Sequence, residues 1–145
     1  MRTMGLDYGE ARIGVALSDP TGLIASPHGV IAEKNQGEQV RKVMALVTET
    51  GAEQLVVGLP LQMDGQAGPM AERAEKFATK LELVTGLTVH RWDERLTSVA
   101  AERVIAESRS RGRGRRGRTG GKQKGDVDKL AATFILQGFL DSRGG

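Results

Sequence analysis

The segment Met4-Gly-Leu-Asp-Tyr-Gly9 places a single acid, Asp7, in apolar and glycine-rich surroundings near the start of the chain. In a strand of period two, its bulky residues face one side, and Asp7 faces the other side together with the two glycines. A carboxylate that has lost part of its water needs a cation, hydrogen bonds or a proton. The segment therefore predicts either a functional acid or, alternatively, an aspartate that caps the turn through Tyr8-Gly9.

The surrounding sequence predicts an α/β alternation. The run Leu55–Leu59 is apolar throughout, as expected for a strand buried on both faces, whereas 36–50 repeats its apolar residues at helical spacing. Two strands joined by a short turn at the start should be antiparallel. The expected elements are strands 2–8, 12–18, 22–32 (bent or at an edge), 53–59 and 87–93, and helices 36–50, 70–84, 97–106 and 127–140. Together they predict a mixed five-stranded sheet with helices on its faces.

Length and composition indicate one soluble domain. The chain has 145 residues and no cysteine, which excludes disulfides and thiolate metal sites and agrees with a cytoplasmic location. No apolar run approaches the length of a membrane span, and acidic and basic residues interrupt the N-terminus where a signal peptide would be apolar.

The positive charge is concentrated in one segment. Between Arg109 and Lys124 the chain has six arginines, two lysines and no acid, so the rest has 13 basic and 18 acidic residues, a net charge of −5. Such a run favours a polyanionic partner. We expect residues 108–125 to form a flexible basic loop, because arginine and glycine bury little apolar surface. Three Phe, one Tyr and one Trp give little support for a base-stacking surface.

Two further acidic positions can join Asp7. Asp93 and Glu94 lie at the C-terminal end of an expected parallel strand, at the sheet edge where α/β proteins place their ligands, but they point to opposite faces. The strand pattern does not choose between them, and either could instead form an ion pair with Arg91 or Arg95.

The last expected helix supplies another acid. Asp128 shares a face with the apolar residues that pack on the sheet, whereas Asp126 lies about 200° away around the helix and suits the N-cap. Capping explains Asp126 but not an aspartate on the core face, so Asp128 is the stronger functional candidate.

Four motifs together resemble the YqgF/RuvX family, described as Holliday junction resolvases and as pre-16S rRNA nucleases. They are Gly5-Leu-Asp-Tyr-Gly9 with Arg12-Ile-Gly-Val-Ala16, Val57-Gly-Leu-Pro60 with Asp64-Gly65, Asp93-Glu-Arg-Leu-Thr97, and residues 126–137 (DVDKLAATFILQ). The resemblance implies an RNase H-like fold. It also implies that Asp7, Glu94 and Asp128 form the acidic triad, which favours Glu94 over Asp93.

Such a triad would hold Mg²⁺ or Mn²⁺, hard cations that prefer oxygen ligands and let an anionic phosphodiester approach carboxylates. In a two-metal scheme Asp7 would bridge the cations, while Glu94 and Asp128 would each hold one. His28 and His90 lie outside the motifs and are expected to be structural or surface residues. The candidates for phosphate contact are Arg12, Arg95, Arg109, Arg111, Arg113, Arg115, Arg116, Arg118, Lys122 and Lys124.

The expected function is therefore a metal-dependent nuclease that acts on structured nucleic acid, with processing of the 5′ end of pre-16S rRNA ahead of junction resolution in DNA. A resolvase would act as a homodimer, because it cuts two strands symmetrically. Two other classes stay open: a non-catalytic nucleic-acid-binding module, and a phosphotransferase of the actin and sugar-kinase type. The latter needs two lobes, whereas this chain has room for one.

Overall fold

The computed structural model describes residues 1–60, 68–96 and 120–144. The elements are β1 (Thr3–Asp7), β2 (Arg12–Ser18), β3 (Ala25–Ala32), α1 (Gln36–Thr50), β4 (Gln54–Leu59), α2 (Pro69–Thr85), β5 (Val89–Asp93), the 3-10 turn η1 (Glu94–Leu96) and α4 (Gly120–Gly144). This order confirms the predicted alternation. The expected helix 97–106 and residues 108–119 of the expected basic loop lie outside the described residues.

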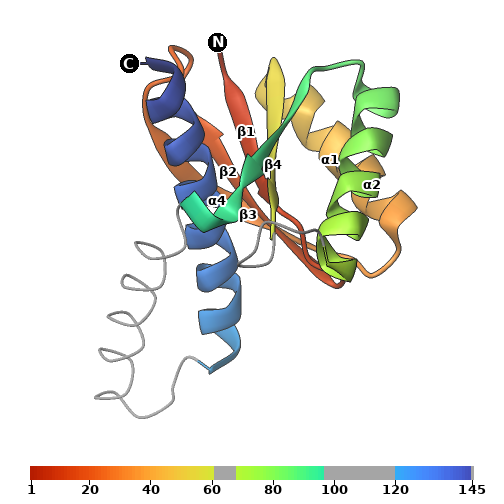
Figure 1. Cartoon of the computed structure of the whole chain (residues 1–145). Helices are drawn as coiled ribbons and strands as arrows, with labels where there is room; N and C mark the ends of the chain where they lie inside the picture. The colour runs from red at the N-terminus through yellow and green to blue at the C-terminus, as the bar shows by residue number, and fades with distance from the viewer. Residues whose placement is uncertain (61–67, 97–119, 145) are drawn as a thin grey trace.

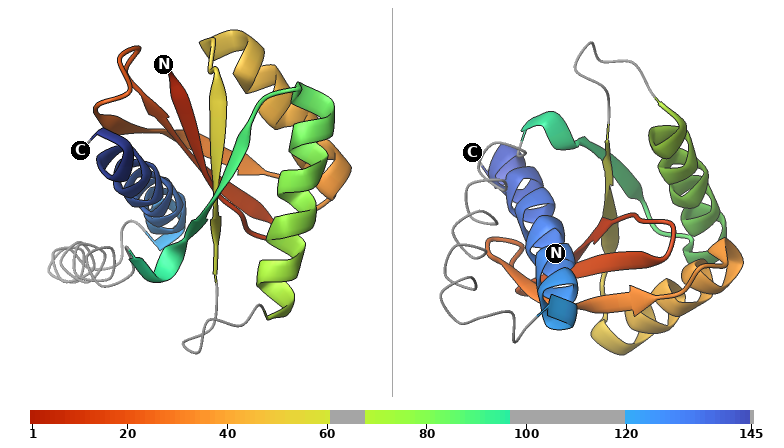
Figure 2. Two further views of the ribbon diagram at one scale, coloured as in Figure 1. Left: turned by 45° about the horizontal axis from the view of Figure 1, so that its top comes forward. Right: turned by 90° about the horizontal axis from the view of Figure 1, so that it is seen from below.

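The five strands form one mixed sheet in the order β3-β2-β1-β4-β5. Neighbours from β3 to β1 are antiparallel, whereas β1, β4 and β5 run parallel. Helix α4 covers one face, and α1 and α2 cover the other (Figures 1 and 2). The predicted fold class, a mixed five-stranded sheet with helices on both faces, is confirmed.

Each face of the sheet has its own apolar core. Strand β4 shows why: Leu55 and Val57 pack with α1 and α2, whereas Val56, between them, packs with α4. All three are fully buried, as the uninterrupted apolar run predicts for a central strand. Residues that alternate along the central strands can therefore be assigned to the α4 face or to the α1/α2 face.

Helix α1 is capped at both ends by its own flanking residues. The Asn35 side chain accepts a hydrogen bond from the backbone N–H of Glu38 (3.0 Å), and this satisfies one of the free donors of the first turn. Gly51 ends the helix in the left-handed region (φ 74°), where glycine meets no steric penalty. The sequence thus positions this helix at both ends.

Helix α4 differs from its expected extent. It begins at Gly120 rather than at residue 127, so Asp126 lies within the helix and not at its N-cap. No proline interrupts residues 120–126, and the helical backbone continues through this polar stretch ahead of the apolar face.

Within the three described ranges, no helix is both long and apolar enough to cross a membrane.

Candidate active site

Asp7 is the last residue of β1, at the edge of the sheet where the parallel strands end. Its neighbour Leu6 is fully buried in the core under α1 and α2. The alternation along the strand therefore directs Asp7 to the α4 face, opposite Gly14 of β2. The acid predicted from the first motif thus lies between the sheet and the helix that carries Asp128.

Glu94 begins η1, directly after β5, and hydrogen-bonds to Asp7 across the end of β4. The space for this contact comes from Gly58 of β4. A Cβ added there would lie 2.8 Å from Glu94 Oε1 and 2.6 Å from Ile135 Cδ1, which is closer than real contacts allow. Glu94, one of the two acids that the strand pattern left open, is therefore the acid that contacts Asp7.

Asp128 reaches the site from α4. The helix approaches the sheet closely at Gly14, where any Cβ would collide with the Asp128 backbone. Asp128 Oδ2 lies 3.2 Å from Arg12 Nε in an ion pair, with a side-chain exposure of 24% for Asp128 and 42% for Arg12. Because β2 places Gly14 and Arg12 on the same face, its sequence both admits the helix and supplies the cation beside Asp128.

Burial raises the pKa of all three acids, and the two other acids raise that of Asp7 further. Burial, the hydrogen bond and charge of Glu94, and the charge of Asp128 raise the pKa of Asp7 from 3.8 to about 8. Burial and the charge of Asp93 raise the pKa of Glu94, while the hydrogen bond with Asp7 opposes that rise. Burial also raises the pKa of Asp128, and Arg12 only partly offsets it. The site therefore holds a proton on Asp7 at neutral pH, as expected for carboxylates brought together without enough positive charge.

The donor chemistry fits a hard divalent cation. Asp7 and Glu94 supply carboxylate oxygens at one point, and such a cation would replace the proton that they share. The arrangement is incomplete, because the described residues contain no group of three or more acidic, histidine or cysteine side chains placed to hold one metal ion. The third predicted acid, Asp128, is instead paired with Arg12.

The turn between Asp7 and Arg12 is held by Gln39, which sequence reasoning missed. This fully buried side chain donates from Nε2 to the carbonyl oxygens of Gly9 (3.1 Å), Glu10 (3.3 Å) and Glu33 (2.7 Å). The sequence did contain a sign of this role, because Gln39 lies among the apolar residues of the buried stripe of α1. Buried polar side chains are nearly always hydrogen-bonded, often to backbone groups. The role of Gly58 in admitting Glu94 was also missed. A lone glycine inside an apolar strand can indicate such a close approach.

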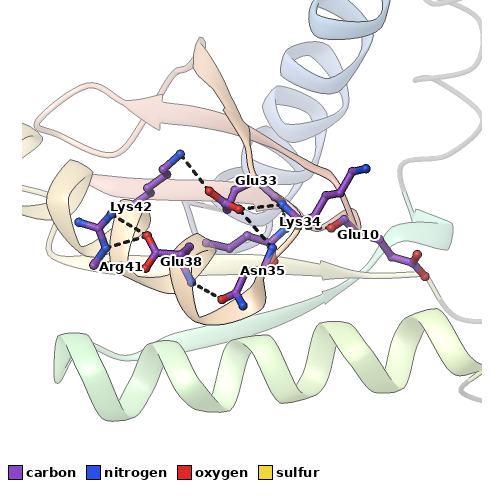
Figure 3. Close-up of polar contacts among 8 residues, drawn as sticks. Glu10, Glu33, Lys34, Asn35, Glu38, Arg41 and Lys42 are labelled. Carbon is purple, nitrogen blue, oxygen red and sulfur yellow. Dashed lines mark hydrogen bonds and ion pairs between the residues drawn. The ribbon is translucent and has the colours of Figure 1, made fainter.

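Charged side chains near the N-terminus of α1 largely pair with one another (Figure 3). Lys42 pairs with Glu33 at 3.3 Å, and Arg41 pairs with Glu38 at 2.6 Å. Arg73 of α2 likewise pairs with Glu10. Arg12 differs from these cations because its partner, Asp128, is one of the candidate site acids.

The other predicted contacts with phosphate are placed only in part. Arg95 lies in η1, and Lys122 and Lys124 lie in the first turns of α4. The six arginines from Arg109 to Arg118 fall outside the described residues.

The two histidines lie where a surface residue and a structural residue are expected. His28 is exposed on β3. His90 hydrogen-bonds to Gln54 and Arg143 and packs against Phe139, with ring centroids 4.7 Å apart. Burial lowers the pKa of His90, which favours its neutral form.

Comparisons with known proteins show the family of the chain. The profile of the RuvX family, described as "Holliday junction resolvase", matches residues 1–142. A relative from Moorella thermoacetica named "Putative pre-16S rRNA nuclease" is 46% identical over 144 residues, which cover 99% of this chain and 97% of the relative. One of the same name from Halothermothrix orenii is 42% identical over 97% of this chain and 95% of its own.

Solved structures show the same fold at low identity. Thermus thermophilus RuvC in complex with a Holliday junction substrate superposes with a TM-score of 0.59 at 17% identity, covering 100% of this chain and 96% of RuvC. The Fowlpox virus resolvase, in a complex with Holliday junction DNA, gives 0.57 at 12% identity and 99% coverage of both chains. The chain therefore belongs to the RuvX family and has the RNase H-like fold that the resemblance implied.

Proposed function

We propose that this protein is a metal-dependent nuclease that hydrolyses phosphodiester bonds in structured nucleic acid and matures the 5′ end of pre-16S rRNA. The observation that carries the proposal is the buried contact between Asp7 and Glu94, with Asp128 close enough to raise the pKa of Asp7. A structural acid would gain nothing from two acidic neighbours, whereas a metal-binding acid needs them. The RNA substrate is supported by the names of relatives 42 to 46% identical to this chain.

In this proposal Asp7, Glu94 and Asp128 hold Mg²⁺ or Mn²⁺. In a two-metal site Asp7 would contact both cations, and Glu94 and Asp128 would each hold one. The cations would supply the positive charge that offsets repulsion between the carboxylates and a phosphodiester, and would lower the pKa of the attacking water. Asp7 would release its proton as the cation binds, so all three side chains would act as carboxylates.

Basic residues would position the substrate. Arg12 lies at the site itself, and Arg95 follows Glu94 directly along the chain. With Arg109, Arg111, Arg113, Arg115, Arg116, Arg118, Lys122 and Lys124, they would contact phosphates without reading the base sequence. The proposed role places the protein in the cytoplasm, where ribosomes assemble.

Junction resolution in DNA is the second candidate. The description of the family profile favours it. In that case the protein would act as a homodimer, because a four-way junction is cut symmetrically. The choice between RNA and DNA depends on recognition of the ribose 2′-hydroxyl.

The test is cleavage of a pre-16S rRNA 5′ segment and a four-way DNA junction by wild type and by Asp7→Asn, with Mg²⁺, Mn²⁺ or EDTA. Asp141→Asn is the matched control, because Asp141 is an exposed acid on α4 that accepts a hydrogen bond from Gln137. We expect wild type and the control to cut RNA with metal, and Asp7→Asn to bind it without cutting. Cleavage of the junction alone would establish the second candidate.

Binding of both substrates without cleavage under every metal condition would contradict the nuclease proposal and indicate a non-catalytic module. Undiminished cleavage in EDTA would contradict the metal requirement alone. ATP binding would indicate the phosphotransferase alternative.

A further inference from the structure

Asp128 has an unusual combination of contacts for a half-buried acid. Its Oδ2 atom is inaccessible to solvent and, among the described residues, accepts no hydrogen bond of normal geometry. Arg12 Nε is nevertheless 3.2 Å from that same oxygen, so the pair is joined by charge rather than by an aligned hydrogen bond. Because no donor in the described part of the chain is aligned on this oxygen, another cation can take the place of Arg12 without breaking a hydrogen bond of normal geometry.

Arg12 is well placed to leave. It begins β2, and its side chain is 42% exposed, so the guanidinium can enter water without opening the core. Water screens the charge of such an exposed guanidinium, so Arg12 holds the Asp128 carboxylate only weakly. A divalent cation attracts a carboxylate more strongly than a monovalent guanidinium does, because it has twice the charge and a smaller radius.

We propose that Arg12 is the internal counter-ion of the metal site: it neutralises Asp128 in the metal-free protein and is displaced when a divalent cation binds. This inference rests on the proposed function, because it concerns the same three acids. It accounts for a site in which two acids meet while the third pairs with an arginine. Displacement completes the acidic set and releases a guanidinium beside the place where a phosphate enters.

The displacement makes Arg12 a competitor of the metal. Removing the competitor should tighten metal binding, whereas removing a ligand or a residue that supports a ligand should weaken it. The sign of the change therefore separates the proposed role from a structural one. By linkage, any cation that binds must weaken the contact between Arg12 and Asp128 by the same factor.

The first experiment measures Mn²⁺ affinity by titration calorimetry for wild type, Arg12→Gln and Arg73→Gln, at one ionic strength. Arg73 is the matched control, because it is a half-exposed arginine paired with Glu10 of the β1–β2 turn. We expect Arg12→Gln to bind Mn²⁺ about threefold more tightly, the factor that corresponds to an exposed ion pair. Arg73→Gln should match wild type. Equal tightening in both variants would indicate general electrostatics and overturn the proposal.

The second experiment follows the Arg12 Nε–Hε signal by nuclear magnetic resonance as Mg²⁺ is added. The signal is identified by its absence in Arg12→Gln. In wild type it should move toward the position of a solvent-exposed arginine, and in Asp128→Asn it should begin near that position and change little. A wild-type signal that stays in place while Mg²⁺ binds would overturn the displacement.

The two proposals fail in different ways. Unchanged or weaker Mn²⁺ binding in Arg12→Gln, with metal-dependent cleavage by wild type, would overturn the counter-ion role and leave the nuclease proposal standing. Absence of Mn²⁺ and Mg²⁺ binding to wild type would overturn both. Thermal unfolding of each variant shows whether the fold is retained.

Discussion

Asp7→Asn should make the metal-free protein more stable at neutral pH while it abolishes cleavage. The raised pKa gives the sign. Below its ordinary pKa of 3.8, Asp7 is protonated in both the folded and the unfolded chain, and its contribution to stability is fully present. That contribution is lost as the pH rises toward about 8, because the unfolded chain ionises freely and the folded site resists ionisation.

The magnitude follows from the same two values. Each unit of pKa difference corresponds to about 1.4 kcal/mol, so folding at pH 7 with Asp7 protonated costs about 4 kcal/mol at most. Asparagine is neutral, has nearly the same shape and can donate a hydrogen bond to Glu94 as the protonated acid does. We expect Asp7→Asn to raise the free energy of unfolding by about 2 to 4 kcal/mol at pH 7, and by little near pH 4.

The assay is urea unfolding in EDTA at pH 4, 7 and 9 for wild type, Asp7→Asn and Asp19→Asn. Asp19 is the opposing control: hydrogen bonds from Thr21, Ile24 and Leu23 hold its pKa well below the usual range. Its contribution to stability is present above its ordinary pKa and is lost as the pH falls, so Asp19→Asn should destabilise the protein at pH 7. A gain for Asp7→Asn that did not depend on pH, or no gain at all, would refute the reasoning about charge.

Three further predictions concern packing, positioning and binding. Gly58→Ala should lower cleavage and stability, the latter by about 1 to 3 kcal/mol, because its Cβ would displace Glu94. Cleavage kinetics and urea unfolding measure both effects, with Gly29→Ala as the control because the Cβ added there meets nothing within 4 Å. Equal losses in the two variants would contradict the predicted clash with Glu94. Gln39→Leu should lower the free energy of unfolding by about 1 to 3 kcal/mol, since three carbonyls lose their donor; an unchanged urea midpoint would exclude this role. Replacing Arg113 and Arg115 with glutamine should weaken binding of RNA and DNA alike and reduce the dependence of binding on salt. Filter binding at several salt concentrations measures both, and a loss for one sequence only would contradict the prediction.

Much of the fold could be read from local patterns. Strand β2 and helix α1 have their expected bounds, because the alternation of Arg12–Ser18 and the helical spacing of apolar residues in 36–50 are local signals. The predicted start of helix α4 was wrong, because residues 120–126 have neither the apolar period nor a cap that would indicate a helix.

The candidate acids were chosen from their residue types and their positions in the motifs, not from their contacts. The strand pattern placed Asp93 and Glu94 on opposite faces but left the choice between them open. Only the crossing of η1 over Gly58 brings Glu94 to Asp7. That contact depends on strands far apart in the chain, so no local pattern contains it.

The sequence by itself determined the order of strands and helices, the two faces of each central strand, and three acids suited to hard cations. These follow from hydrophobic period and side-chain chemistry, which are properties of neighbouring residues. Only the tertiary structure decided that Glu94 meets Asp7, that Asp128 pairs with Arg12, and that Gln39 holds the turn between Asp7 and Arg12. Such distances and shared charges exist only after the sheet has brought distant segments to one edge.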